Sequence, residues 1–450
     1  MIFKSINPAN GEVLASFTED IDYFSKIRIA EQTYDRWKKA DIKERIRLML
    51  NLADILEARK TELAKEISLE MGKTLKSATA EIEKCAITAK YYCRTAEEQL
   101  RSIEVKNYAY KAYSQYEPQG GVLAVMPWNF PYWQALRFAI PTILAGNVIL
   151  LKHAPNVFMS ATKLEAIFIE AGFEKGIFQN LLVGIDKIES IVADQFIKGV
   201  TLTGSNIAGS SLASLAGKYL KKSVLELGGS DPFLVLADAN IDNAATFAVK
   251  SRFQNAGQTC IAAKRWIVVE DIYEEFINNV SDKINKLIAG DPFDVATDFG
   301  PVARLDLAKK IEGQIDFLVN HGARKLIGGE RVGCLLPPTL LEVSRDLSHS
   351  FTEELFGPVA CITKAKNTEE AIEIANETSF GLGASLWTQD LENGELLLKK
   401  LNAGNVYLNS MVKSDASMPF GGINQSGYGR ELGVYGLHEF CNVKSYIIEK

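Results

Sequence analysis

The hydrophobic pattern of the first hundred residues is typical of helices. From Ile21 to Leu100 the chain has no proline and one glycine, and apolar residues recur at every third and fourth position, as in IRLMLNLADILEARKTELAKEI. Residues three and four apart lie on the same face of a helix. The pattern therefore predicts that most of this segment is helical.

Short apolar stretches alternate with helical patterns over residues 109–229. The segment AYKAYSQYEPQGGVLAVMP alternates around paired glycines and predicts strand, turn, strand. The apolar stretches NVILLK, FQNLLV, GVTLTG and SVLEL follow, and we expect helices between them that start near Tyr132, Ser160 and Ser205. Such alternation is typical of βαβ units in a parallel sheet.

A second alternating series begins at DPFLVL and includes RWIVVE, a long helical pattern from Tyr273 and another over residues 305–319. The C-terminal VKSYIIEK alternates like a strand and has no evident partner before it. We therefore expect an α/β fold with two domains, together with a small β element made from the mid-chain strands and the tail.

Length and charge narrow the class of protein. A chain of 450 residues exceeds what one hydrophobic core usually supports, so two or three domains are expected. The net charge is −6 and the charges are well mixed, which argues against nucleic acid or a membrane surface as the main partner. The chain has neither an apolar run of about eighteen residues nor a signal-peptide pattern at its start. We expect a cytoplasmic protein.

Six cysteines are scattered without CxxC pairs, and four histidines show no ligand spacing. In a reducing compartment the cysteines should be free thiols, and no metal site is expected.

One of these cysteines, Cys260, follows a Gly-Gln-Thr turn in the segment QNAGQTCIA. A thiol is a useful nucleophile only as thiolate, and a glycine-containing turn permits a tight, partly exposed backbone. The alternative is that Cys260 is a small buried residue.

A carboxylate and an amide also lie where strands are expected to end. Glu226 in VLELGGSDP is placed at the carboxyl end of a parallel strand, where α/β sheets position active sites. In an apolar cleft its pKa would rise, which suits a base that takes a proton from water, although it could instead be a solvated strand end. Asn129 in MPWNFPYW could donate to a developing oxyanion, although asparagine before a turn is common.

The segment TLTGSNIAGSS predicts a strand that runs into a helix with glycine and serine at its start. Free N–H groups at such a helix start favour phosphate. Ser210 stands where a P-loop needs lysine, and no GxGxxG is present, so a dinucleotide would bind without the usual fingerprint.

Taken together, the motifs resemble those of the aldehyde dehydrogenase superfamily, over essentially the whole chain. They stand in the same order and spacing: NPANGEVLAS, MPWNFP, LLKHAP, TLTGS, LELGGSDP, GQTC, EELFGPV and PFGGINQSGYGRELG. Within the superfamily the chain is most similar to the short bacterial succinate-semialdehyde dehydrogenases. The resemblance implies two Rossmann-like parallel-sheet domains and a small β oligomerisation element.

The resemblance also implies the boundaries of these parts and their assembly. The dinucleotide-binding domain would comprise residues 1–100 and 118–228, and the catalytic domain residues 229–424. The oligomerisation element would comprise residues 101–117 and 425–450, and the protein would be a homodimer or homotetramer.

The reaction implied by the resemblance is oxidation of an aldehyde, most simply succinate semialdehyde, to a carboxylate. Cys260 would be the nucleophile, Asn129 with the Cys260 N–H would stabilise the oxyanion, and Glu226 would activate the water that hydrolyses the thioester. Cofactor contacts would come from Trp128, Lys152, Pro155, Gly204, Ser205, Glu354 and Phe356.

Departures from relatives bear on cofactor and substrate. Pro155 stands where many relatives have a glutamate that binds the ribose hydroxyls, so NAD is expected and NADP is possible. Phe138 stands where many relatives have lysine, and its neighbour Arg137 could bind a substrate carboxylate or pair with a structural acid. Ala262 replaces the second cysteine of a redox switch, so that switch is absent.

Three other functions stay open at this point. One is a CoA-acylating dehydrogenase, against which Glu226 argues because those relatives commonly lack this base. Another is a dehydrogenase of a different small aliphatic aldehyde. The third is a non-enzymatic relative, which the joint presence of Cys260, Glu226 and Asn129 makes a poor explanation.

Overall fold

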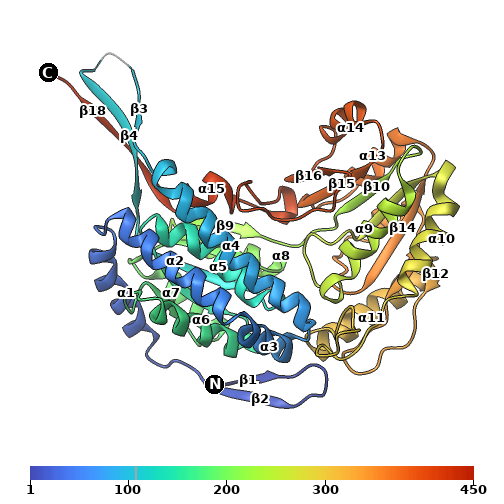
Figure 1. Cartoon of the computed structure of the whole chain (residues 1–450), viewed down its shortest axis with the longest axis horizontal. Helices are drawn as coiled ribbons and strands as arrows, with labels where there is room; N and C mark the ends of the chain where they lie inside the picture. The colour runs from blue at the N-terminus through green and yellow to red at the C-terminus, as the bar shows by residue number, and fades with distance from the viewer. Residues whose placement is uncertain (107–108) are drawn as a thin grey trace.

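A computed structural model describes residues 1–106 and 109–450 of the chain. The chain forms two α/β units side by side, from which a narrow β arm projects (Figure 1). The first unit contains a six-stranded sheet and the second a seven-stranded sheet, which confirms the predicted fold class.

The first sheet has the strand order β17-β9-β8-β5-β6-β7. Its five main strands are parallel: β5 (Gly121–Met126), β6 (Val148–His153), β7 (Phe178–Asn180), β8 (Ile197–Thr203) and β9 (Lys222–Glu226). The helices between them are α5 (Pro131–Leu144), α6 (Phe158–Glu170), α7 (Ile188–Ala193) and α8 (Asn206–Lys218). Because β5 lies between β6 and β8, the strand order reverses at β5, and ligands bind beside such a switch point in open α/β sheets.

The predicted N-terminal helices are confirmed as α1 (Tyr23–Trp37), α2 (Ile42–Ala58), α3 (Lys60–Met71) and α4 (Leu75–Gln99). Their apolar faces pack into the core of the first unit, where α4 contacts α5. The residues before them form a hairpin of β1 (Ile2–Ile6) and β2 (Val13–Thr18), which the helical pattern did not predict.

The second sheet has the order β12-β13-β14-β11-β10-β15-β16 and is parallel except for the pairing of β12 with β13. Its strands are β10 (Pro232–Val235), β11 (Arg265–Val269), β12 (Arg324–Ile327), β13 (Thr339–Glu342), β14 (Val359–Ala365), β15 (Gly383–Trp387) and β16 (Asn405–Leu408). The helices of this unit are α9 (Ile241–Phe253), α10 (Tyr273–Ile284), α11 (Leu305–Asn320), α12 (Arg345–Ser350), α13 (Thr368–Asn376) and α14 (Leu391–Leu398). The central strands are buried on both faces, which explains their continuous apolar sequences.

The C-terminal strand finds its partner in the mid-chain segment. Strand β18 (Cys441–Ile448) follows α15 (Gly433–His438) and pairs antiparallel with β4 (Lys111–Pro118), which also pairs with β3 (Ile103–Glu104). This three-stranded arm extends away from both units (Figure 1). The strand β17 (Gly427–Tyr428), which the sequence grouped with the arm, pairs instead with β9 in the first sheet.

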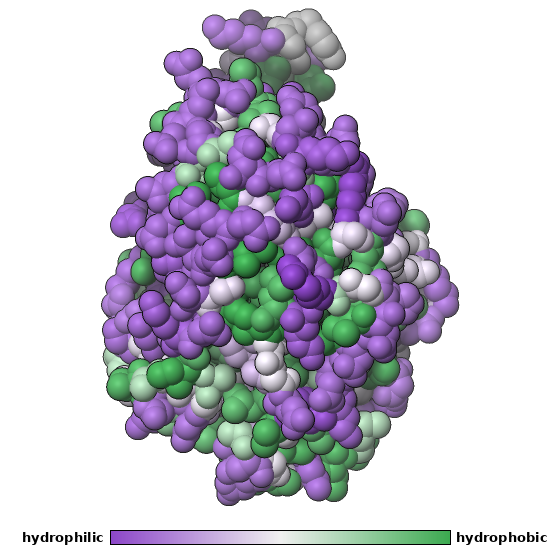
Figure 2. Space-filling view, turned by 90° about the vertical axis from the view of Figure 1, so that its right-hand side faces the viewer, coloured by the Kyte–Doolittle hydropathy of each residue, from purple (hydrophilic) through white to green (hydrophobic). Residues whose placement is uncertain are grey.

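The outer side of the second unit is covered mainly by hydrophilic residues, with hydrophobic ones gathered near its middle (Figure 2). Within residues 1–106 and 109–450, no helix is both long and apolar enough to cross a membrane. The same residues contain no cluster of three His, Cys, Asp or Glu side chains that could hold a metal ion.

Candidate active site

A cleft of about 600 Å³ opens at the carboxyl ends of β5, β8 and β9, and residues of the second unit close it. A volume of this size lies within the usual range for sites that bind a small molecule or cofactor. Eight of the residues selected from the sequence line it: Trp128, Asn129, Gly204, Ser205, Glu226, Cys260, Glu354 and Phe356. The fold thus brings together side chains that are far apart in the sequence.

Cys260 reaches the cleft through a strained turn that follows α9. Asn255 and Ala256 have φ values of 54° and 52°, in the left-handed region that non-glycine residues seldom adopt. Gly257 continues the turn at φ 70°, and a Cβ there would overlap the backbone of Gly357. Such strain costs on the order of 1–3 kcal/mol per residue and persists where the surroundings enforce it, as they commonly do at functional sites. The turn fixes where the thiol lies.

The Cys260 thiol is half-buried, and burial raises its pKa to about 12, against the opposing effect of Arg137 and Lys264. The residue follows a 3₁₀ turn and no helix starts at it, so a helix dipole does not activate it. Lys264 lies four residues later, and its ammonium donates to the carbonyl oxygens of Cys260 at 2.6 Å and Thr259 at 3.1 Å. The resting group is therefore a thiol, and its proton must be taken up when it attacks.

Asn129 follows β5 and is almost wholly buried. Its side-chain Nδ2 donates to the backbone carbonyl oxygen of Gln258 at 2.9 Å. Its backbone carbonyl oxygen accepts from Nδ2 of Asn255 at 3.0 Å. A side-chain amide nitrogen carries two hydrogens. One is used by Gln258, so the other can serve an oxyanion in the cleft.

Glu226 ends β9, with only 2% of its surface exposed. Burial raises the pKa of its carboxyl well above the ordinary value, although the nearby Arg137 opposes this. The Arg137 Nη2 lies 4.0 Å from Glu226 Oε2, while Oε1 of Glu226 has no hydrogen-bond partner among the described residues. A buried carboxyl with a raised pKa and a free oxygen can accept a proton near neutral pH.

Arg137 does not line the cleft. Its guanidinium is buried, forms an ion pair through Nε with Glu431, and lies 3.4 Å from the Thr203 hydroxyl. Arg137 thus pairs with a structural acid, the second of the two roles considered from the sequence. The geometry gives no support to direct binding of a substrate carboxylate by Arg137.

The two glycines of LELGG are required by close approaches. A Cβ on Gly228 would overlap the Glu354 carboxylate, and a Cβ on Gly229 would lie 2.8 Å from the Cys260 carbonyl oxygen. The Gly229 N–H donates to Glu354 Oε1 at 3.1 Å. The glycines therefore let the cysteine loop and the Glu354 segment meet at the end of β9.

The first turn of α8 lines one side of the cleft. Ser205 caps the helix, accepting from the Ala208 N–H at 3.3 Å, and Gly204 lies directly before it. At the other side, Trp128 and Phe356 meet edge to face with ring centroids 5.8 Å apart. Helix-terminal N–H groups and aromatic walls fit the pyrophosphate and the planar ring of a nicotinamide dinucleotide.

Lys152 and Pro155 lie beyond the residues that line the cleft. Lys152 is the second-last residue of β6 and lies in register with Val125 of β5. Its ammonium donates to the His153 carbonyl oxygen at 3.0 Å. Burial lowers the Lys152 pKa to about 8, so it stays mainly charged at neutral pH. Pro155 begins a 3₁₀ turn just after this strand. Both residues thus flank the switch point of the sheet.

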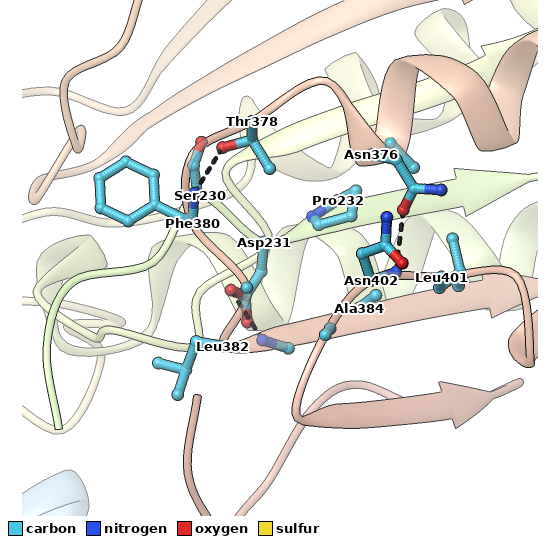
Figure 3. A pocket seen from close by; sticks show the side chains of 14 residues that line it. Ser230, Asp231, Pro232, Asn376, Thr378, Phe380, Leu382, Ala384, Leu401 and Asn402 are labelled. Carbon is cyan, nitrogen blue, oxygen red and sulfur yellow. Dashed lines mark hydrogen bonds between the residues drawn. The ribbon is translucent and has the colours of Figure 1, made fainter. Parts of the chain in front are cut away.

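A second cavity lies between the start of β10, the end of α13 and the start of β15, where Asp231, Asn376 and Leu382 line it (Figure 3). Its volume is about 10 Å³, enough for no more than one water. The Asp231 carboxylate in it accepts from the Gly383 N–H at 3.1 Å, and Asn376 accepts from the Asn402 N–H at 2.9 Å. The first contact joins the residue before β10 to the start of β15, and the second joins the end of α13 to the loop before β16, so the cavity leaves no room for a substrate.

Three residues of the site were not selected from the sequence. Lys264 and Asn255 hold the cysteine turn, and Glu431 pairs with Arg137. Lys264 and Asn255 lie within five residues of Cys260, and Glu431 lies in the motif PFGGINQSGYGRELG. Their closeness to these motifs is the only feature of the sequence that could have identified them.

Comparison with known proteins agrees with this geometry. The family model described as aldehyde dehydrogenase family matches residues 1–446. Succinate-semialdehyde dehydrogenase (NADP(+)) 1 from Mycobacterium bovis is 44% identical over 454 residues, covering 99% of each chain. Succinate-semialdehyde dehydrogenase (NADP(+)) from Mycobacterium avium is 45% identical over 455 residues, covering 99% of this chain and 96% of the relative.

A solved structure of similar shape is the succinic semialdehyde dehydrogenase from Streptococcus pyogenes in complex with NADP+ as the cofactor. It has a TM-score of 0.97 and 35% identity, and covers 100% of both chains. With a match of the family model over almost the full length, the chain belongs to the aldehyde dehydrogenase family.

Proposed function

We propose that this protein oxidises succinate semialdehyde to succinate with a nicotinamide dinucleotide, through a covalent intermediate on Cys260. The observation that carries this proposal is the convergence of Cys260, Glu226 and Asn129 on the same cleft as the α8 N-terminus. The relatives named above add support for the substrate, because their names give that aldehyde.

In this mechanism the Cys260 sulfur bonds to the aldehyde carbon and its proton passes to solvent water in the open cleft. The carbonyl oxygen becomes an oxyanion, which the free N–H of Asn129 and the Cys260 backbone N–H stabilise. When bound, the oxidised nicotinamide supplies the acceptor for the hydride that leaves this carbon. Glu226 then takes a proton from water, whose oxygen attacks the thioester carbon, and the Cys260 thiolate leaves.

Water is the proposed acyl acceptor because Glu226 faces the cleft that Cys260 faces. A CoA-acylating enzyme needs no base for water at this point. Product analysis separates the two: succinate should form without CoA, at a rate that added CoA does not raise. Succinyl-CoA formation that depends on added CoA would establish the alternative.

The proposal for the cofactor is that both NAD(+) and NADP(+) are accepted, with the higher kcat/KM for NAD(+). Pro155 supplies neither a carboxylate that repels a 2′-phosphate nor a hydroxyl that binds it. Pro155→Ser should raise kcat/KM with NADP(+). Pro155→Glu should abolish turnover with NADP(+) while turnover with NAD(+) survives. A strong NADP(+) preference of the unchanged protein, as the relatives' names suggest, would make Lys152 the first residue to test.

We further propose that the chain assembles as a homodimer or homotetramer through the β arm. The three-stranded sheet of the arm projects from the rest of the chain (Figure 1). On its strand β18, the side chains of Val443 and Ile447 are 58% and 56% exposed. Pairing with a second copy would cover this apolar surface.

A further inference from the structure

Lys73 and Glu81 form an ion pair that is sealed from solvent. Lys73 Nζ lies 2.5 Å from Glu81 Oε2, and the two side chains are 0% and 1% exposed. By contrast, the side chains of the Lys60–Glu83 ion pair, which joins α3 to α4, are 41% and 43% exposed. Removing two charges from water costs free energy that their attraction often fails to recover, so a buried pair calls for a role beyond stability.

The pair contacts the start of α5 directly. The second carboxylate oxygen of Glu81, Oε1, accepts from the backbone N–H groups of Tyr132 at 2.8 Å and Trp133 at 3.0 Å. Helix α5 receives no cap from its own N-cap side chain, Phe130. A carboxylate from α4 therefore satisfies the N–H groups that the first turn leaves free, and it does so where the helix dipole favours negative charge.

The lysine of the pair contacts the adjoining residue of the loop. Lys73 Nζ lies 3.7 Å from the centroid of the Phe130 ring, a cation–π contact. On the other side of the loop, His153 Nε2 is 2.8 Å from the Pro131 carbonyl oxygen. Phe130 and Pro131 directly follow Asn129, so these contacts fix the segment that carries the oxyanion donor.

We propose that the Lys73–Glu81 pair is a positioning device for Asn129: it holds the first turn of α5 so that the second Asn129 N–H points to the oxyanion. This inference rests on the role proposed above for Asn129. Positioning matters here because an error of about 1 Å in a catalytic group can cost on the order of 100-fold in rate. Neither residue touches the reacting atoms, since neither lines the cleft.

The test compares Lys73→Met/Glu81→Met in two backgrounds, Asn129 and Asn129→Ala. Replacing both partners avoids an unpaired buried charge and keeps side-chain length. The measurement is the first-turnover rate of reduced cofactor formation. The expected loss is about 10- to 100-fold with Asn129 present, and under about twofold in the Asn129→Ala background, because the pair acts through that residue. The surface control Lys60→Met/Glu83→Met should change neither rate by more than about twofold.

A rescue variant guards against simple misfolding. Lys73→Met/Glu81→Gln keeps an amide oxygen that can accept from Tyr132 and Trp133, and should recover most of the first-turnover rate. Equal losses in the two backgrounds, or a glutamine variant as slow as the methionine variant, would overturn the positioning role. If Asn129→Ala alone retains the unchanged rate, the proposed role of Asn129 fails, and this inference fails with it.

Discussion

Burial and two nearby charges of opposite sign set the pKa of Glu226. Burial raises the pKa of the Glu226 carboxyl, while Arg137, whose Nη2 lies 4.0 Å from Oε2, lowers it, and the charge of Glu431 raises it. The ion pair of Arg137 with Glu431 partly cancels both effects. At this scale the proton affinity of the buried Glu226 carboxylate depends on the charges of Arg137 and Glu431, and this supports its proposed role as a base.

The pH profile of turnover should follow this arrangement. As the proposed base, Glu226 would act in its deprotonated form, so kcat limited by deacylation should rise as pH increases through its raised pKa. Glu431→Gln removes a negative charge, lowers the Glu226 pKa and should move this rise to lower pH. Arg137→Met removes the nearer positive charge and should move it to higher pH.

The opposite directions of the two shifts are the informative result, measured as kcat against pH with saturating aldehyde. Glu189→Gln, in a surface ion pair with Lys218 on neighbouring α8, is the matched control and should leave the profile in place. Shifts in the same direction for both variants would contradict the electrostatic account of Glu226.

We propose Lys84 as a second candidate cation, beside Arg137, for the charged end of the proposed substrate. Arg137 is committed to Glu431, whereas Lys84 on α4 meets the Ser414 hydroxyl at 2.6 Å and lies 4.2 Å from the Trp133 ring centroid. Trp133 and Arg137 are four residues apart on α5 and so share a face of that helix. Burial lowers the Lys84 pKa to about 8, which leaves it largely charged at neutral pH.

Lys84→Met should therefore raise KM for succinate semialdehyde by about tenfold, the value of a charged hydrogen bond, and leave butanal nearly unaffected. Arg137→Met should lower kcat on both aldehydes alike. Lys90→Met, also on α4 but paired with Glu57 at the surface, is the control. A carboxylate-specific loss in Arg137→Met, with none in Lys84→Met, would restore the original hypothesis for Arg137.

At the scale of elements, the site is built where strands end and turns begin. The strand ends of β5, β8 and β9 could be predicted because each apolar stretch is followed by a residue of distinct chemistry: Asn129, Ser205 and Glu226. The strained turn before Cys260 could be anticipated only in part, from its glycine. The left-handed Asn255 and Ala256 were not predictable, since tertiary contacts enforce a conformation that their local preference opposes.

Pairings distant in sequence were the least predictable elements. The hairpin β1–β2 lies in a short N-terminal stretch with no helical or strand periodicity that stands out, and β17 has only two residues. The tail alternates clearly, yet its register with β4 joins residues more than 300 positions apart, such as Cys441 and Pro118. Alternation predicts a strand but cannot identify its partner.

Glycine 229 offers a test at this scale. In Gly229→Ala the added Cβ would lie 2.8 Å from both the Cys260 carbonyl oxygen and Asp231 Oδ1, so the cysteine loop must move. The expected result is a loss of about 100-fold in first-turnover rate, with cofactor binding largely retained. Gly217→Ala on α8, where a Cβ meets open space, should keep full activity. Full activity of Gly229→Ala would show that the loop tolerates displacement.

At the scale of the whole molecule, the two units each supply residues to the cleft. The first unit supplies Asn129, Glu226 and the α8 N-terminus, and the second supplies Cys260 and Glu354. The cleft exists only where the two meet. None of the described residues of β3, β4 and β18 lines the cleft, which is consistent with a role of the arm in assembly.

Assembly through the arm makes a direct prediction. Val443→Asp/Ile447→Asp places two charges on the exposed apolar face of β18 and should lower the molecular mass measured by sedimentation to that of the monomer. Val295→Asp, at a fully exposed position elsewhere, should leave the assembly intact. An unchanged mass in the β18 variant would show that another surface joins the subunits.

The most direct test of the catalytic account is peptide mass spectrometry of the Glu226→Gln variant mixed with succinate semialdehyde and oxidised cofactor. With the base for water removed, the acyl intermediate should accumulate. The account predicts one succinyl group per chain on the peptide that contains Cys260, matched by one reduced cofactor. Reduced cofactor formed while Cys260 stays free, or an acyl group on Cys334, the other half-buried cysteine, would contradict it.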